Sequence, residues 1–365
     1  MKKSFYVLAA VLTVVMSFPL NLALAQKSAP QSSITYPGDT NETINRRAKW
    51  IEGAKREGML VWWGTARPEE AKELIAAFNK VYPFIKVVYW RGRGDEVGTK
   101  FEAEFTAGRP TVDTCFGGGF EHYPRWAKMG MLAEFSSIIP RIEKFDKRMY
   151  GRRGDWFMPG LGPKVPQYNT KLVTAAEAPR NWDDLLDPKW KGQVGGEVEA
   201  EDWTVLAVAE GGWGIEKTEN FLTRLKEQKP RFIQGGSAAH ALLVAGEFKI
   251  NALGNLRHVL ISQKKKASVD WVRVKPVIVF GPSFVLSKKA PHANAARLFL
   301  EWQLSPHGLP LWAEVTQNFV PGMATQISRL LEGMPLVVRT EEVSIKIADL
   351  DLIKKFNKRF FGIED

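Results

Sequence analysis

Short apolar runs alternate with amphipathic stretches through residues 46–145, and this alternation predicts how that part of the chain folds. Apolar residues between Ala71 and Phe78 recur at helical spacing, and Pro68 suits the first position of that helix. Asp95 is placed to cap a second helix, which runs through Gly108. The apolar runs have the length of buried strands and lie at 60–63, 85–90 and 111–116. Strands that alternate with helices predict a parallel sheet covered by helices.

The second half of the chain shows the same alternation. The segment 231–254 (RFIQGGSAAHALLVAGEFKINALG) predicts a strand, a Gly-Gly turn, a helix capped by Ser237 and a further strand. The run at 251–260 (NALGNLRHVL) predicts a strand that feeds a loop, and this loop carries Arg257 and His258 side by side. The pattern of the whole chain is that of an α/β protein.

The first 25 residues have the three parts of a secretory signal peptide. A positive start precedes an apolar run at 5–20, and a small-residue cleavage motif ends at Ala25. A membrane anchor is the alternative, but the run is short for a span, and Pro19 and Asn21 interrupt it. We therefore expect cleavage after Ala25 and a periplasmic protein.

Residues 26–45 are polar and rich in Ser, Thr and Pro, which predicts a flexible leader with order beginning near Arg46.

The length of 365 residues suits about two domains. A single cysteine, Cys115, excludes a disulfide framework and a thiolate metal cluster. The formal net charge of +11 favours anionic partners, although the sequence carries no recognised nucleic-acid motif.

Three motifs that carry chemistry are only approximated. The glycines of segment 92–98 read G-x-G-x-x-x-G, one residue longer than a dinucleotide-binding loop. Ser237 lies in a sequence like that of a nucleophile elbow, but Ala239 stands where that motif has glycine, so a helix cap is the better interpretation. The five histidines form no compact metal-binding pattern. No cofactor, metal or catalytic residue is expected.

In a parallel α/β sheet, ligands bind where the carboxyl ends of the strands open. The segments 65–67, 93–95 and 117–119 all follow predicted strands. Helices that start at Pro68, near Glu121 and at Ser237 would point their free N–H groups at the same crevice, which favours an anion. Three arginines lie beside these positions: Arg67, Arg93 and Arg257. The alternative is that they pair with local carboxylates such as Glu69 or Asp95.

Four longer stretches resemble a known family. They are LVWWGTARPEEAKELIAAFNKVYPFIKVVYWRG, YNTKLVTAAEAPRNWDDLLDPKWKGQVG, GGSAAHALLVAGEFKINALG and FVLSKKAPHANAARLFLEWQLSPHG. They are similar to the extracellular solute-binding proteins of bacterial ABC importers, in the branch that includes the ferric-ion-binding proteins. The resemblance covers roughly 50–320, and its most specific part is 168–195.

This resemblance implies a type II periplasmic-binding-protein fold with two α/β lobes, each a mixed or parallel sheet flanked by helices. The ligand would lie in the cleft between the lobes, and a monomer in its closed form would deliver it to an inner-membrane ABC permease. The expected first lobe is 46–145 with about 283–324. The expected second lobe is 146–282 with 325–365.

Ferric members of this branch hold iron with adjacent tyrosines, which by order of elements would fall at Arg257 and His258. A guanidinium offers paired donors to a carboxylate or phosphate, whereas iron needs anionic ligands. The expected solute is therefore a small organic anion: a phosphate ester, a phosphonate or a carboxylate. Ferric iron as cargo and an exported hydrolase remain the alternatives. The residues expected to bind the solute are Thr65, Ala66, Arg67, Arg93, Gly94, Gly118, Gly119, Tyr168, Trp203, Thr204, Gly236, Ser237, Asn255 and Arg257.

Overall fold

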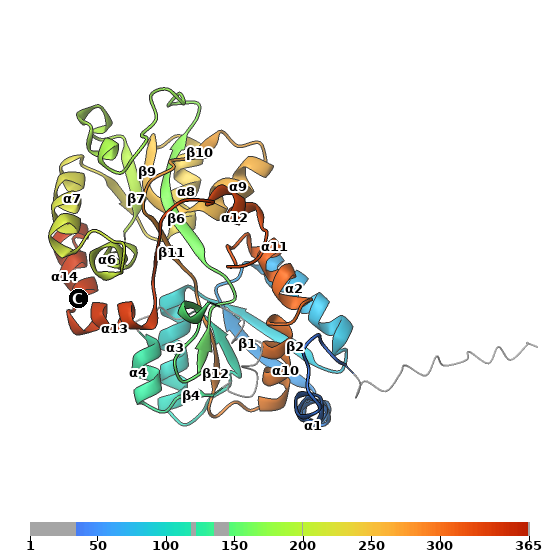
Figure 1. The fold of residues 1–365 in the computed structure, drawn as a ribbon. Helices are drawn as coiled ribbons and strands as arrows, with labels where there is room; N and C mark the ends of the chain where they lie inside the picture. The colour runs from blue at the N-terminus through green and yellow to red at the C-terminus, as the bar shows by residue number, and fades with distance from the viewer. Residues whose placement is uncertain (1–33, 118–121, 135–145, 199, 364–365) are drawn as a thin grey trace, which may run out of the picture.

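The computed structural model describes residues 34–117, 122–134, 146–198 and 200–363. Two lobes, each with one sheet and helices packed on it, make up the α/β fold, with the first lobe below and the second above in Figure 1. The expected α/β class with two lobes is confirmed. The expected signal peptide at 1–25 lies outside the described residues. Among the described helices, none is both long and apolar enough to cross a membrane.

The first sheet is built on the strands that the apolar runs predict. Its spatial order is β2-β1-β3-β12-β4, and β5 also pairs with β12. The strands β1, β2 and β3 are parallel, and β12 runs antiparallel to β3, β4 and β5. The bounds are β1 Met59–Gly64, β2 Lys86–Arg91, β3 Thr114–Phe116, β4 Leu132–Ala133, β5 Trp156–Phe157 and β12 Phe284–Ser287.

The described helices of this lobe are α1 Asn41–Glu57, α2 Pro68–Val81, α3 Gly94–Thr106, α4 His122–Lys128, α10 Ala293–Gln303 and α11 Gly308–Thr316. Helix α2 starts at Pro68 as predicted, and it buries Leu74 and Phe78. The prediction that Asp95 caps α3 is wrong. The backbone N–H of Arg93 instead donates to Oε2 of Glu96 at 2.9 Å, and Asp95 lies within the first turn.

The prediction of a flexible leader is wrong for residues 34–45. Thr40 caps helix α1, and the chain ahead of it packs onto the lobe. The cause is Arg47, which is 1% exposed and forms buried ion pairs with Asp39 and Glu301, both at 2.7 Å. Its guanidinium also lies 4.5 Å over the ring of Tyr36. A buried cation with two carboxylate partners fixes the segment that composition alone marks as polar linker.

The second sheet has the order β13-β11-β6-β9-β7-β8, with β10 paired to β6. Strand β6 is antiparallel to β9, β10 and β11, whereas β7 is parallel to β8 and β9. Its strands are β6 Gly162–Asn169, β7 Val194–Glu197, β8 Arg231–Ile233, β9 Ile250–Asn255, β10 Val269–Trp271, β11 Val277–Phe280 and β13 Leu336–Val338. Its helices are α6 Glu201–Val208, α7 Ile215–Glu227, α8 Gly236–Ala245, α9 Leu256–Lys264, α12 Gln326–Leu330, α13 Glu341–Asp349 and α14 Leu352–Phe356.

The chain passes between the sheets at 158–161, which joins β5 to β6, and at 281–283, which joins β11 to β12, and it returns to the second lobe a last time between α11 and β13. The first crossing differs from the expected lobe boundary at 145. Because β5 pairs with β12, the first sheet keeps the chain as far as Phe157. Beside this crossing, Leu161 and Phe319 exchange backbone hydrogen bonds of 2.7 and 2.8 Å.

Candidate functional site

Two arginines from different lobes meet at one carboxylate. Arg67 precedes α2 of the first lobe, and Arg257 lies in the first turn of α9 of the second lobe. Arg67 Nη2 lies 2.7 Å from Glu70 Oε1, and Arg257 Nη1 lies 3.3 Å from the same oxygen. The side chain of Glu70 is only 1% exposed. The structure thus brings two of the three expected arginines together, one from each lobe.

Local helix geometry places both arginines. The backbone N–H of Arg67 donates to Glu70 Oε2 at 2.7 Å, so Glu70 also caps α2. Asn255 caps α9 by accepting the N–H of Arg257 at 3.0 Å. The expectation of a loop after β9 is therefore wrong. Because Asn255 satisfies the first turn, the chain enters a helix directly from the strand and points Arg257 back at α2.

The charges around Arg257 do not balance. Burial lowers the pKa of its guanidinium, Glu70 opposes that effect, and Arg67 and Arg91 lower the pKa further. Nε of Arg257 is buried without a hydrogen-bond partner in the part of the chain that the structure describes. A cationic group with a spare donor, beside two other arginines, suits an added anion.

Two histidines next to this cluster are neutral. Burial, with Arg257 acting in the same direction, holds the pKa of His258 well below its usual value. Burial also lowers the pKa of His240 to about 4. The ring nitrogens of His240 bond to Gln167 and Ser262, both at 2.8 Å, whereas Nδ1 of His258 has no partner among the described residues. His258 can therefore add a hydrogen bond to the site without adding charge.

A second polar cluster lies at the end of the second sheet where β9 leads into Arg257. Lys164 of β6 pairs in register with Asn255, and its Nζ lies 2.6 Å from Oδ2 of Asp202. Burial raises the pKa of Asp202 to about 6, although Lys164 opposes this shift. Glu197, at the end of β7, accepts the backbone N–H of Gly236 at 2.7 Å. This carboxylate already occupies the start of α8, where the sequence predicts a solute anion.

The first lobe contributes the expected ends of β1 and β3. Thr65 is half-buried, and its N–H donates to the carbonyl of Phe116 at 3.1 Å. Gly117 follows with φ of +127°, a conformation that favours glycine, and the Tyr123 hydroxyl donates to its carbonyl at 3.0 Å. Ala66 is buried and accepts a hydrogen bond from the Tyr89 hydroxyl at 2.6 Å. Gly118, Gly119 and the expected helix start near Glu121 lie outside the described residues.

The structure does not bring Tyr168, Trp203 and Thr204 to this site. Tyr168 pairs with Ile250 at the far end of β6, away from Lys164, and its hydroxyl lies 3.4 Å from Asp270. Trp203 is 2% exposed and packs in the core of the lobe. The hydroxyl of Thr204 donates to a carbonyl of its own helix. Trp203 and Thr204 belong to the core, because the face of α6 that carries them turns toward the sheet and α7, and Tyr168 is buried on β6.

Two further expectations also change. Arg93 is half-exposed and pairs with Asp95 at 2.6 Å, which is the local pairing considered as the alternative. It therefore stands apart from the Arg67–Arg257 pair, beside Gly94 at the start of α3. Ser237 does not cap α8, since Gly235 takes the position before the helix with φ of +89°, which leaves Ser237 exposed in the first turn.

Sequence reasoning missed Glu70, Lys164 and Asp202. The sequence does carry a signal for Glu70, because a glutamate at the third position of a helix is typical of a capping box. Lys164 interrupts a strand that is otherwise buried, which marks it as a polar residue with a partner. Asp202 is one of two acidic residues in the first turn of α6, and nothing in the sequence separates it from Glu201.

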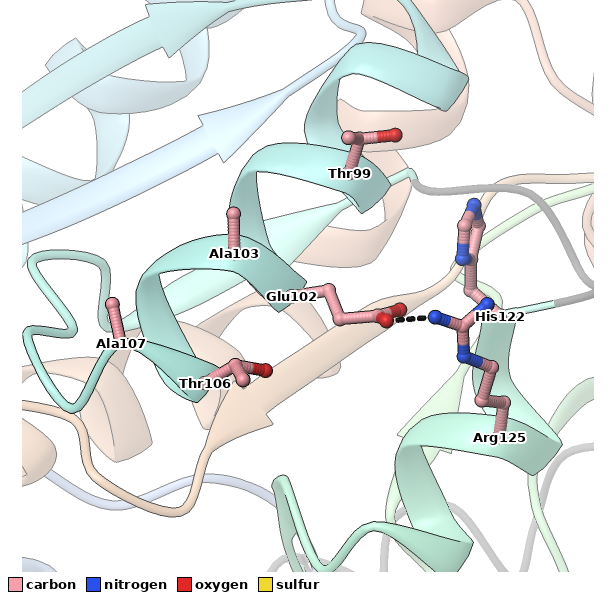
Figure 2. A pocket seen from close by; sticks show the side chains of 7 residues that line it. All are labelled: Thr99, Glu102, Ala103, Thr106, Ala107, His122 and Arg125. Atoms are coloured by element: carbon pink, nitrogen blue, oxygen red, sulfur yellow. Dashed lines mark hydrogen bonds and ion pairs between the residues drawn. The ribbon is translucent and has the colours of Figure 1, made fainter.

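A separate groove of about 560 Å³ lies between α3 and α4 of the first lobe (Figure 2). Its lining residues are Thr99, Glu102, Ala103, Thr106, Ala107, His122 and Arg125. An ion pair between Glu102 and Arg125 crosses it, and the His122 ring stacks on Trp126 at 5.1 Å. All these residues belong to one lobe, so this groove is distinct from the contact between lobes. The described residues contain no group of three or more His, Cys, Asp or Glu side chains that could hold a metal ion.

Comparisons with known proteins point to one family of solute-binding proteins. The model of the bacterial extracellular solute-binding protein family matches residues 73–327. An uncharacterized protein of Haemophilus influenzae is 26% identical over 271 residues, which cover 71% of this chain and 76% of that protein. The expected resemblance is confirmed by this family match.

Solved structures of periplasmic binding proteins share the fold, and two of them serve as examples. AfuA of Actinobacillus pleuropneumoniae, a periplasmic binding protein with exogenous fructose 6-phosphate bound, is 20% identical, with a TM-score of 0.71 over 83% of this chain and 99% of that chain. Iron-bound HitA of Pseudomonas aeruginosa is also 20% identical, with a TM-score of 0.67 over 84% of this chain and 99% of that chain. At these identities the likeness is one of fold.

Proposed function

Because the chain belongs to the bacterial extracellular solute-binding protein family, we propose that it is the periplasmic component of an ABC importer for a small anionic organic solute. The solute is a phosphate ester, a phosphonate or a carboxylate, and it binds between the two lobes. The closed protein delivers it to an inner-membrane permease. The role needs no catalytic chemistry from this chain.

The observation that carries this proposal is the meeting of Arg67 and Arg257, from different lobes, at Glu70. Each lobe supplies one guanidinium, so an anion that contacts both favours closure of the lobes. Thr65 and Gly117 lie at the ends of β1 and β3 in the first lobe, where α/β proteins bind ligands. His258 supplies a neutral hydrogen-bonding group next to the arginines.

The structural neighbours bind different cargoes, since AfuA was solved with a sugar phosphate and HitA with iron. Two features of this chain favour the organic anion. The positions where the ferric branch would place tyrosines hold Arg257 and His258. Neither side chain offers an anionic oxygen ligand, and the guanidinium carries a positive charge that repels a ferric ion.

The test is calorimetric titration of the mature protein after its endogenous solute has been removed. The titrants are glucuronate, glucose 6-phosphate, methylphosphonate and ferric citrate. The proposal predicts saturable binding of one solute per chain for at least one of the organic anions. Binding of iron alone, with the visible absorption of a ferric complex, would instead assign the protein to iron transport.

A further inference from the structure

We propose that Glu70 sets the charge of the solute, so that the site prefers an organic acid with one negative charge to a phosphate monoester with two. This inference rests on the proposed function and narrows its substrate class. Glu70 then acts as a built-in anion that neutralises part of the charge of the two arginines. It is a specificity-determining residue rather than a contact that merely holds the helix.

The position of Glu70 carries the argument. One oxygen, Oε1, lies 2.7 Å from Arg67 and 3.3 Å from Arg257, and the other caps α2. The carboxylate is buried, with its side chain 1% exposed, while the side chains of Arg67 and Arg257 are 26% and 19% exposed. An incoming anion can therefore reach the guanidinium groups, but Glu70 stays in place behind them.

The charges at the cluster limit what it can accept. Arg67 and Arg257 both contact Glu70, so two guanidinium groups face one buried carboxylate, which leaves one positive charge. Arg91 and Glu69 act on Arg257 with opposite signs, and both are exposed to solvent, which screens their charges. The adjacent His258 adds none, because burial keeps it neutral.

One residual positive charge matches a carboxylate better than a phosphate monoester. A monoester carries about 1.5 to 2 negative charges at pH 7, so part of its charge would stay unpaired in a site shielded from water. A second unpaired negative charge would also meet the buried Glu70 at short range. The site therefore discriminates by repulsion as well as by attraction.

The experiment compares two solutes with one carbon skeleton, glucuronate and glucose 6-phosphate, which differ in the charge of the group at the sixth carbon. Their affinities are measured at pH 7.5 for the wild type, Glu70→Gln and Glu69→Gln. Glutamine keeps an acceptor for the Arg67 N–H but removes the charge. Glu69→Gln removes the same charge from an exposed neighbour 3.5 Å from Arg67 Nε and serves as the matched control.

The wild type is expected to prefer glucuronate, and Glu70→Gln is expected to shift the preference toward the phosphate by about tenfold. Glu69→Gln should change it by less than about threefold, since solvent screens an exposed charge. Arg67→Gln, a second variant that lowers the charge, should shift the preference the other way. Equal preferences in wild type and Glu70→Gln would overturn the inference alone. A wild type that prefers glucose 6-phosphate to glucuronate would overturn it as well, whereas failure of the wild type to bind glucuronate, glucose 6-phosphate or methylphosphonate would contradict both the inference and the proposed function.

Discussion

Replacement of Arg257 by alanine should weaken solute binding strongly. Its Nη1 lies 3.3 Å from Glu70 Oε1, a separation at which two unit charges attract by about 5 kcal/mol at an effective dielectric constant near 20. A solute anion at similar range gains a comparable amount, less the screening that follows from a side chain 19% exposed. Loss of one partner of such a pair costs about 2–5 kcal/mol. The dissociation constant should therefore rise by about 30-fold to several thousand-fold.

The assay is calorimetric titration with the solute that the protein retains from the cell. Arg257→Lys should fall between wild type and alanine, because lysine keeps the charge but offers no planar pair of donors. Arg273→Ala is the matched control: its side chain is 56% exposed and pairs with Asp270 at the far end of the second sheet. An unchanged affinity in Arg257→Ala, or an equal loss in Arg273→Ala, would refute the role of the cross-lobe arginine.

Three further predictions concern residues outside the arginine pair. Arg47→Met should lower the free energy of unfolding by about 3–5 kcal/mol in urea titrations, because it strands two buried carboxylates. Trp203→Ala should cost about 3–5 kcal/mol of stability by opening a core cavity, yet leave solute affinity unchanged in calorimetry. The raised pKa of Asp202 means that its contribution to stability is full below about pH 4 and is lost as pH rises through about 6. In the wild type this titration should lower the free energy of unfolding by about 3 kcal/mol between pH 4 and pH 7. Asp202→Asn, which lacks the titrating group, should not show this decrease.

Each of these predictions has a control variant or a result that would contradict it. Lys55→Met, at an exposed ion pair with Glu52, should change the free energy of unfolding by less than about 0.5 kcal/mol. If Lys55→Met and Arg47→Met lost the same stability, the buried ion pairs of Arg47 would not explain the effect. A fall in solute affinity in Trp203→Ala at a temperature where it stays folded would return this residue to the site. A pH dependence of unfolding that is identical in wild type and Asp202→Asn would contradict the assignment of the titrating group.

The first β-α-β unit could be predicted closely because its signals are local. The apolar run of β1, the proline at the start of α2 and the run of β2 lie within one short segment, and the helix begins at the predicted residue. The family resemblance similarly gave the two-lobe fold. Both depend on patterns that neighbouring residues complete among themselves.

The features that could not be predicted depend on partners far along the chain. Arg47 orders the segment before it through Glu301, a residue 254 positions away. Glu70 meets Arg257 across 187 positions, so no local pattern marks it as part of a site between lobes. The expectation that Tyr168 lies at the site is wrong, because the sequence of β6 does not tell which end of the strand lies beside Arg257. That follows only from its antiparallel register with β9.

The central claim, that the arginine-lined contact between lobes binds a small organic anion, is tested most directly by native mass spectrometry. The protein should be purified from its own periplasm without refolding, so that it keeps its solute. The account predicts one bound species per chain with the mass of a small organic acid or phosphate ester, which is lost in Arg257→Ala. A bound iron atom, with or without a small anion, would contradict it and place the protein among the ferric-ion-binding transporters.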